Sequence, residues 1–384
     1  MSFRWRYLPE TLALLVALWV QFRLGQWVMA SAAVRRWPRL RVLVRVSVVA
    51  ACLWLFFGME ASSFFIAPRL PGWAWLVWVR GAALLWIVFS FLLFLAMLVW
   101  RRLQAYNPER RRFLLAARTA LFGAPLAALG YGVFVERSRF QVREVNVHIP
   151  GLHPDLDGLR LVQVSDIHLS PFLSERELAR VVDMANQTRA RVAVVTGDFI
   201  TLRGDPLEAC IRQIARLRAD AGIYGCLGNH EVYAKAEEAA TILGAREGVR
   251  MLRGASQRLP FGAAAINLHG VDYQSMRQPY LVGSRASLVP GELNVLLSHN
   301  PDVFETAAAQ GWDLTLAGHT HAGQITVEIL SEHLSLARFY TPYVYGLYRR
   351  GPSSIYVNAG VGTVGLPARL GAPPEIALIR LCAT

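Results

Sequence analysis

The stretch Gly81–Trp100 constrains the fold of this chain most, because it runs for 20 residues without a charge. A helix rises about 1.5 Å per residue, so this length crosses a hydrocarbon layer roughly 30 Å thick. Val46–Ile66 contains a single charge and Thr119–Val135 contains none. Thr11–Val34 is interrupted by one arginine and two glutamines, so a helix lying in the membrane interface is the alternative there. We expect about four transmembrane helices.

The positive charge of the chain is concentrated in the same region. The formal net charge is +13, and residues 1–135 supply all of it with 16 arginines and 3 glutamates. The remaining residues carry 24 basic and 24 acidic side chains. Arginine-rich loops between apolar helices are typical of membrane proteins, whereas a nucleic-acid-binding protein places its basic residues along one groove. We therefore expect the lipid bilayer as a partner, and no nucleic acid.

The arginines of the connecting segments predict an orientation. Segments 32–41 and 101–112 together contain nine arginines, against six on the opposite side. Positively charged loops favour the cytoplasmic side. We expect a multi-pass protein of the bacterial inner (cytoplasmic) membrane, with its C-terminal domain on the extracytoplasmic side. The difference of three arginines leaves the opposite orientation open.

The composition changes near residue 140, which predicts a transmembrane region over residues 1–139 and a second domain over residues 140–384. In the second domain short β-rich runs alternate with helical ones, as in an α/β domain with a buried sheet. Helices are expected over 174–190, where Ser174 and Glu177 form a capping box, and over 207–219. Strands are expected over 159–164, 191–195, 222–227, 265–271, 293–298 and 314–317. The four cysteines form no CxxC motif and are interpreted as small core residues.

Polar side chains follow five of the expected strands at the point where each strand ends. Open α/β sheets place ligand sites at the carboxyl ends of their strands. One such motif alone is better explained as an ordinary polar turn, but five together predict a shared site. Carboxylate, amide and imidazole donors without thiolates suit Mn²⁺, Zn²⁺ or Fe²⁺, and they are too many for one tetrahedral ion. The residues at the strand ends are Asp166, His168, Asp198, Asn229, His230, His299, His319 and His321.

The order DxH, GD, GNHE, H, GHTH resembles the calcineurin-like metallophosphoesterases over about residues 155–381. The segments "GHTHAGQI" and "NAGVGTVGLPARLGAPPEI" resemble the bacterial branch of membrane-attached phosphohydrolases, which includes UDP-2,3-diacylglucosamine hydrolase-like relatives. The resemblance implies an α/β fold with a metallophosphoesterase-type β-sandwich flanked by helices, here preceded by the all-α transmembrane bundle.

The resemblance also implies a set of site residues around two divalent metal ions. His230 would be the catalytic residue that faces the substrate phosphate, where it stabilises charge or protonates the leaving group. One metal would be held by Asp166, His168, Asp198 and His321, and the other by Asp198, Asn229, His299 and His319. If segment 319–321 is extended, its two histidines point the same way and serve one ion each.

Two positions depart from the family pattern. Many relatives have a second acidic residue three positions after the bridging aspartate, where this chain has Thr201, and close relatives often have glycine at Ala322. Glu231 and Asn300 are either outer supports of the ligands or ordinary polar loop residues. Gly360 and Gly362 either line the site or form a turn between strands. Arg203, Arg349, Arg350 and Arg369 are candidates for gripping a phosphate or head group, although each alone is better explained as a surface arginine.

The sequence thus predicts a membrane-anchored, metal-dependent hydrolase of phosphate ester or pyrophosphate bonds. The anchor favours a lipid-linked or nucleotide-activated glycolipid substrate. Two alternatives stay open: a broad phosphodiesterase acting on soluble esters, and a catalytically inert membrane metal sensor or scaffold. Relatives that act on UDP-linked glycolipids need the cytoplasmic side, which conflicts with the orientation that the arginines favour.

Overall fold

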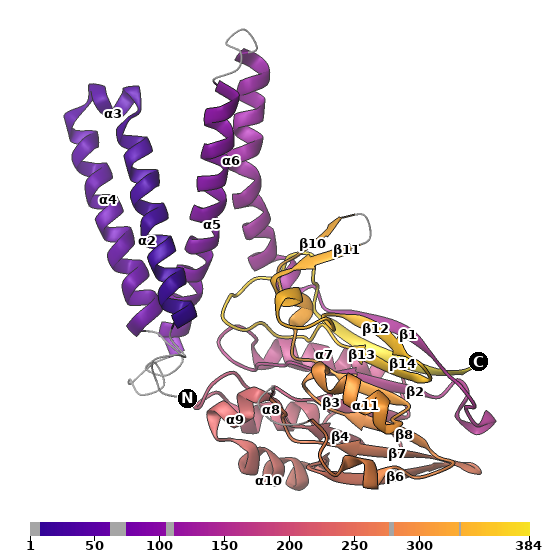
Figure 1. Ribbon diagram of the computed structural model, residues 1–384. Coiled ribbons are helices and arrows are strands. Elements are labelled where there is room, and N and C mark those ends of the chain that lie inside the picture. Colours follow the sequence, from indigo (N-terminus) through magenta and orange to yellow (C-terminus); the bar gives the residue numbers. More distant parts are fainter. Residues whose placement is uncertain (1–7, 62–73, 105–110, 276–279, 330–331) are drawn as a thin grey trace. The chain divides into compact units, whose positions relative to one another are not determined.

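The computed structural model describes residues 8–61, 74–104, 111–275, 280–329 and 332–384 (Figure 1). The chain forms two compact units, Met1–Tyr131 and Gly132–Thr384, and each is described by itself. The sequence placed the boundary between residues 139 and 140. In the structure Gly132 already belongs to the second unit, because its carbonyl accepts a hydrogen bond from the Arg369 N–H at 3.2 Å.

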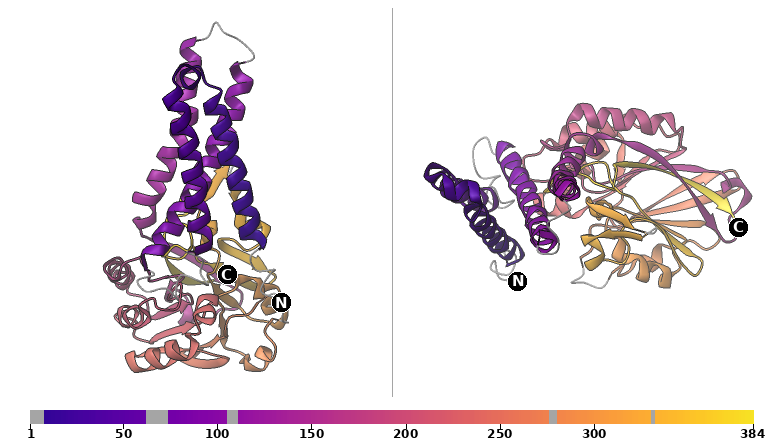
Figure 2. Two further views of the ribbon diagram at one scale, coloured as in Figure 1. Left: turned by 90° about the vertical axis from the view of Figure 1, so that its left-hand side faces the viewer. Right: turned by 90° about the horizontal axis from the view of Figure 1, so that it is seen from above.

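The first unit is helical, and α2 runs alongside α4 and α5 (Figures 1 and 2). The Trp27 ring at the end of α2 stacks on Phe94 with 5.0 Å between ring centroids, and the Arg101 guanidinium lies 5.5 Å from the same ring. The ends of α2 and α5 are therefore neighbours, which brings Arg101 to the end of the unit where α3 carries Arg35. The helices are α2 (Leu8–Met29), α3 (Ala32–Arg36), α4 (Pro38–Phe56), α5 (Ala74–Gln104) and α6 (Arg111–Phe134).

Three helical segments of the described residues, rather than the predicted four, are long and apolar enough to cross a membrane: Thr11–Met29, Pro38–Met59 and Trp75–Arg102. The fourth predicted span, Thr119–Val135, falls in α6, whose side chains are described from residue 121 onward. The first two residues of the predicted span, 119 and 120, therefore lie outside the residues whose side chains are described. The last five residues of the predicted span Val46–Ile66 lie outside the described residues. The three apolar helices indicate a membrane protein.

The second unit contains two six-stranded sheets packed face to face, together with a two-stranded ribbon (Figure 1). In the first sheet the order is β1-β14-β2-β3-β4-β5, and in the second it is β12-β13-β9-β8-β7-β6. The first sheet comprises β1 (Gln141–Ile149), β14 (Glu375–Ala383), β2 (Arg160–Val164), β3 (Val192–Thr196), β4 (Ile223–Cys226) and β5 (Val249–Met251). The second comprises β12 (Gly346–Arg350), β13 (Ser353–Val357), β9 (Leu314–Ala317), β8 (Leu293–Leu297), β7 (Ala264–Gly270) and β6 (Ala255–Phe261). The ribbon pairs β10 (Thr326–Ile329) with β11 (Glu332–Ser335).

Burial on both faces explains why the central strands read as continuous apolar runs. Successive side chains of a strand point to opposite faces. In β3, Val192 and Val194 pack with residues of the second sheet, while Ala193 and Val195 pack under the helices. The pairings from β2 to β5 are parallel, as expected for strands that are buried on both faces.

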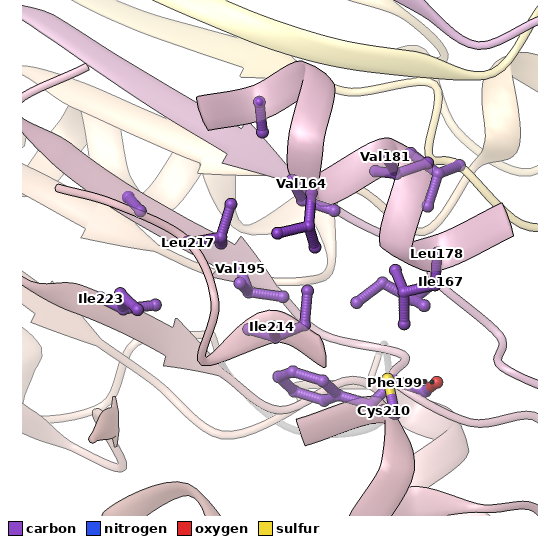
Figure 3. Packing of buried hydrophobic residues seen from close by; sticks show 14 of the residues in the cluster. Val164, Ile167, Leu178, Val181, Val195, Phe199, Cys210, Ile214, Leu217 and Ile223 are labelled. Carbon is purple, nitrogen blue, oxygen red and sulfur yellow. Dashed lines mark hydrogen bonds between the residues drawn. The ribbon is translucent and has the colours of Figure 1, made fainter. Parts of the chain in front are cut away.

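Helices cover the outer faces of the sandwich. Val164 and Val195 of the first sheet pack against Leu178 and Val181 of α7, and Ile214 of α8 joins the same cluster (Figure 3). The predicted Ser174–Glu177 capping box is present, with 3.3 Å from the Glu177 N–H to the Ser174 hydroxyl. The helices are α7 (Glu175–Gln187), α8 (Leu207–Ile214), α9 (Asn229–Ala234), α10 (Glu237–Glu247) and α11 (Phe304–Gln310). The predicted fold class, an α/β sandwich with flanking helices and a preceding helical bundle, is confirmed.

Candidate metal centre

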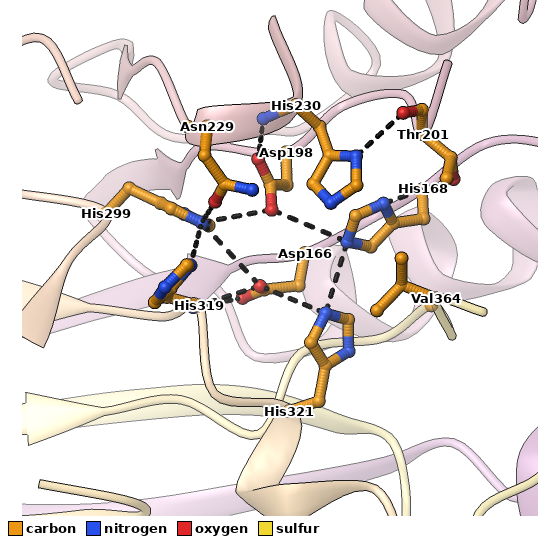
Figure 4. Close-up of polar contacts among 12 residues, drawn as sticks. Asp166, His168, Asp198, Thr201, Asn229, His230, His299, His319, His321 and Val364 are labelled. Carbon is orange, nitrogen blue, oxygen red and sulfur yellow. Dashed lines mark hydrogen bonds and ion pairs between the residues drawn. The ribbon is translucent and has the colours of Figure 1, made fainter. Parts of the chain in front are cut away.

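Five strands from both sheets end at one cluster of buried polar side chains (Figure 4). β2 leads into Asp166 and His168, and β3 leads into Asp198. β4 leads through Gly228 into α9, whose first residues are Asn229 and His230. From the second sheet, β8 leads into His299, and β9 leads into His319 and His321. The eight residues predicted from the sequence therefore meet at one edge of the sandwich.

Four side chains at one end of the cluster direct their ligand atoms toward one another. His168 Nε2 and His321 Nε2 are 3.1 Å apart. His321 Nε2 lies 3.4 Å from Asp166 Oδ1, and His168 Nε2 lies 3.5 Å from Asp198 Oδ2. Two imidazole nitrogens this close either share a proton or point their lone pairs at a common cation.

A second group lies on the other side of Asp198. His299 Nε2 is 3.0 Å from Asp198 Oδ2 and 3.1 Å from Asn229 Oδ1. His319 Nδ1 is 3.2 Å from the same His299 nitrogen. Asp198 Oδ2 therefore contacts both groups, and it is the atom that a pair of ions would share.

These distances fit two metal ions. Ligand atoms held about 2.1 Å from one ion, with angles between 90° and 110°, are about 3.0–3.4 Å from each other. The contacts within each group, from 3.0 to 3.5 Å, match this spacing closely. Oxygen and imidazole donors are also the chemistry that borderline divalent ions select.

The backbone at the site adopts an uncommon conformation. Non-glycine residues rarely adopt positive φ, and those that do are concentrated at functional sites. Five of the ten such residues in the described chain belong to the cluster: Asp166, His168, Asp198, His319 and His321. The expectation that segment 319–321 is extended is wrong, because both of its histidines have left-handed backbones, with φ of 77° and 52°. This turn directs one imidazole to each group.

Comparisons with known proteins agree with this geometry. Residues 159–323 match the family model of the calcineurin-like phosphoesterases. The chain is 30% identical over 246 residues to an uncharacterized metallophosphoesterase of Campylobacter jejuni, covering 63% of each chain. It is 29% identical over 283 residues to one of Bacillus subtilis, covering 72% of this chain and 98% of that one. It is also 30% identical to a transmembrane protein with a metallophosphoesterase domain of Danio rerio, covering 65% of this chain and 59% of that one.

Residues 159–323 thus form a domain of the calcineurin-like phosphoesterases. The alignments of the chain with the Campylobacter and Danio proteins span less than two thirds of those relatives. The matched family is that of the calcineurin-like phosphoesterases, and these relatives are named as metallophosphoesterases or as carrying such a domain. Members normally bind two divalent metal ions, in agreement with the two groups of donors that share Asp198.

Three of the four histidines of the two donor groups are held neutral. Burial lowers the pKa of His319 to about 3, and it holds the pKa values of His168 and His321 well below the usual value. Neutral imidazoles are the form that binds metals.

Burial would also lower the pKa of His299, but Asp198 and Asp166 outweigh it and raise that pKa to about 10, so this ring must release its proton when a metal binds. Burial alone would raise the pKa of Asp198, but His299 and His230 outweigh it and hold the pKa well below its ordinary range. The shared aspartate is therefore ionised.

Hydrogen bonds from the backbone fix the orientation of these ligands. His299 Nδ1 donates to the Thr196 carbonyl at 2.6 Å, which leaves Nε2 facing Asp198. Glu231, one of the two suggested outer supports, accepts the Asp198 and Gly228 N–H groups at 2.9 and 2.8 Å. The second, Asn300, only caps the following turn and donates to the Gln274 carbonyl.

Two glycines allow the close approach of neighbouring segments to the aspartates. A Cβ on Gly228 would lie 2.1 Å from Asp198 Oδ1, and one on Gly360 would lie 2.6 Å from Asp166 Cβ. Gly360 also has a φ of 71°. It therefore packs against the site, which decides one of the alternatives that the sequence left open.

The arginines suggested as phosphate grips are placed differently from one another. Arg369 is fully buried, and its guanidinium donates to the backbone carbonyls of Gly362, Ala372 and Ala359. Its guanidinium donors are therefore engaged by the backbone and do not face a substrate. The alternative interpretation of Arg369 as a surface arginine is also wrong. Arg350 pairs with Glu305.

The sequence reasoning missed three residues that support the site. Ser165 donates from its hydroxyl to Asp166 Oδ2 at 2.6 Å. Gly228 admits Asp198, and Asp205 accepts the N–H groups of Thr201 and Leu202. The serine adjoins the DxH motif and the glycine begins the GNHE motif, but nothing in the sequence connects Asp205 with the site.

Proposed function

We propose that this chain is a membrane-attached, dinuclear metal-dependent phosphoesterase that hydrolyses a phosphate ester or pyrophosphate bond. The observation that carries the proposal is the pair of donor groups that share Asp198 Oδ2. Asp166, His168, Asp198 and His321 are assigned to one ion. Asp198, Asn229, His299 and His319 are assigned to the other. When bound, the two ions would polarise the phosphoryl oxygens and lower the pKa of a coordinated water.

His230 is assigned the catalytic role among the residues of the chain itself. Its backbone N–H donates to Asp198 Oδ1 at 2.9 Å, and its Nδ1 donates to the Thr201 carbonyl at 2.7 Å. Carbonyl oxygens only accept, so the neutral ring carries its proton on Nδ1 and leaves Nε2 for the substrate. The imidazole lies beside His168, with 4.7 Å between ring centroids, and one nitrogen is close enough to Asp198 to reach a phosphate held there. A protonated Nε2 would donate to the leaving oxygen.

We propose that the substrate is a phosphorylated lipid or a nucleotide-activated glycolipid in or beside the bilayer. The apolar helices of the first unit support this choice, because a chain held at the membrane meets lipid substrates at high local concentration. The arginines in segments 32–41 and 101–112 favour a bacterial cytoplasmic membrane with the catalytic domain on the outer side.

The experiment that tests the activity uses the full chain in detergent with added Mn²⁺. Wild type is expected to hydrolyse bis(4-nitrophenyl) phosphate and to release phosphate or a phosphomonoester from a lipid extract. The variants Asp198→Asn and His230→Ala should lose at least about 10²-fold in kcat. Bound metal without turnover of any ester would contradict the enzyme and favour a sensor. Turnover of soluble esters alone would reject the lipid substrate. Labelling an engineered surface cysteine in intact cells decides the side of the membrane.

A further inference from the structure

The catalytic histidine is connected to a buried carboxylate that lies outside the metal ligands. The Thr201 carbonyl accepts the Nδ1 proton of His230 at 2.7 Å. The same peptide group carries the Leu202 N–H, which donates to Asp205 Oδ2 at 2.8 Å. One planar amide thus joins the carboxylate to the imidazole. The Thr201 N–H also donates to that oxygen, at 3.0 Å.

These linked hydrogen bonds transmit the effect of the Asp205 charge through the peptide to the His230 imidazole. An anion that accepts from an amide N–H polarises the amide, and its carbonyl becomes a stronger acceptor for the next donor. The effect is strongest where water is excluded, and both Asp205 and Thr201 are buried, with 8% and 6% of their surfaces exposed. The Asp205 charge therefore strengthens the bond that holds the proton on His230 Nδ1.

Burial of the ionised Asp205 carboxylate lowers the stability of the folded domain. Burial raises the pKa of Asp205 to about 6, although two backbone N–H groups and His230 oppose the rise. An asparagine oxygen could accept the same two N–H groups without a charge. A neutral residue would therefore close the turn at Thr201–Asp205 equally well, and turn geometry alone does not explain the carboxylate.

We propose that Asp205 is a positioning residue for catalysis, which fixes the tautomer and orientation of His230 through the Thr201–Leu202 peptide. The proposal rests on the role of His230 in the proposed hydrolase. With Nδ1–H held by the peptide, Nε2 is the nitrogen that takes up a proton from solvent to give the imidazolium and then passes it to the leaving oxygen, which returns the ring to the Nδ1–H tautomer. Asp205 thus contributes to protonation of the leaving group without touching the substrate.

The kinetic test compares two esters that differ only in the leaving group, methyl 4-nitrophenyl phosphate and methyl phenyl phosphate. Asp205→Asn in the full chain with Mn²⁺ should lower kcat for the phenyl ester about tenfold and change kcat for the nitrophenyl ester less than twofold, since the better leaving group needs little protonation. KM should not change. His230→Ala should lower kcat for both esters, because the imidazole also stabilises charge on the phosphate, and it should lower kcat further for the phenyl ester.

Asp313→Asn is the matched control, because Asp313 is also a partly buried carboxylate that accepts a backbone N–H, from Asn294 at 2.8 Å, but it lies away from His230. It should leave the ratio of the two rates unchanged. An equal effect of Asp205→Asn on both esters, or no effect on either, overturns the proposal. If wild type turns over neither ester, the proposed function fails instead.

A spectroscopic test of the role of Asp205 does not require catalytic turnover. In the metal-free protein, ¹⁵N-labelled histidine should show His230 as a single Nδ1–H tautomer in wild type. In Asp205→Asn it should show a mixture of tautomers or a weaker Nδ1–H hydrogen bond. His269, which is buried against Ser256 outside the metal centre, reports in both proteins whether the domain is folded. Identical His230 signals in the two proteins would overturn the proposal.

Discussion

Gly228→Ala should disable the metal centre through one added methyl group. The backbone of Gly228 is extended, with φ of −101° and ψ of −174°, so alanine brings no backbone strain there. Its Cβ would, however, lie 2.1 Å from Asp198 Oδ1 and 2.7 Å from the Asp198 backbone nitrogen. Carbon and oxygen in contact need about 3.2 Å, so the carboxylate must move by about 1 Å.

A displacement of this size in a catalytic group costs about 10²-fold in rate. The crowding itself costs about 1–3 kcal/mol of stability. We expect kcat/KM for bis(4-nitrophenyl) phosphate to fall at least about 10²-fold, with loss of both metals in elemental analysis. Gly244→Ala is the control, because Gly244 lies in α10, away from the ligands, and its Cβ would lie 2.7 Å from the Val249 carbonyl. It should lose stability but keep its metals. Wild-type activity and metal content in Gly228→Ala would refute the reasoning.

The remaining predictions concern the ligands and their surroundings. His321→Ala and His319→Ala should each remove one ion, whereas Asp198→Asn should remove both. Elemental analysis measures this, and equal losses in all three variants would contradict a shared aspartate. Asp205→Asn should stabilise the metal-free protein above pH 6 by up to about 3 kcal/mol, because the folded carboxyl has a pKa of about 6 against an ordinary aspartate pKa of 3.8. The gain should shrink as pH falls from 6 and vanish below about pH 4, where both states of wild type are protonated; denaturant unfolding across pH checks the trend, and a constant difference would count against it. Arg369→Met should lower the free energy of unfolding by about 2–4 kcal/mol, since buried carbonyls lose their donor, and Arg369→Lys should recover only part of it.

Much of the domain could be predicted because its elements are locally encoded. The apolar run of β3 and the Ser174 capping box appear in the sequence as they appear in the structure. The helix predicted over 207–219 ends earlier, at Ile214. There the Asn186 side chain, far away in sequence, accepts the Arg218 N–H and donates to the Arg216 carbonyl, which replaces further helical bonds.

The ligand residues of the site could be predicted from the sequence because each follows a strand, and the fold brings the ends of these strands together. The geometry in which the side chains converge could not be predicted. The left-handed turn at His319 and His321 depends on contacts with Asp166, whose oxygens accept the His319 N–H at 2.9 and 3.1 Å. The environment of Arg369 depends on the glycine loop that folds around its guanidinium. Such features arise from tertiary packing, which no local pattern records.

The most direct test of the account is the anomalous diffraction of crystals of the full chain loaded with Mn²⁺. We predict two peaks per chain, roughly 3.5–4 Å apart, with one Asp198 oxygen between them. A single peak, or two peaks with Asp198 directed away from one of them, would contradict the shared aspartate on which the proposed chemistry depends.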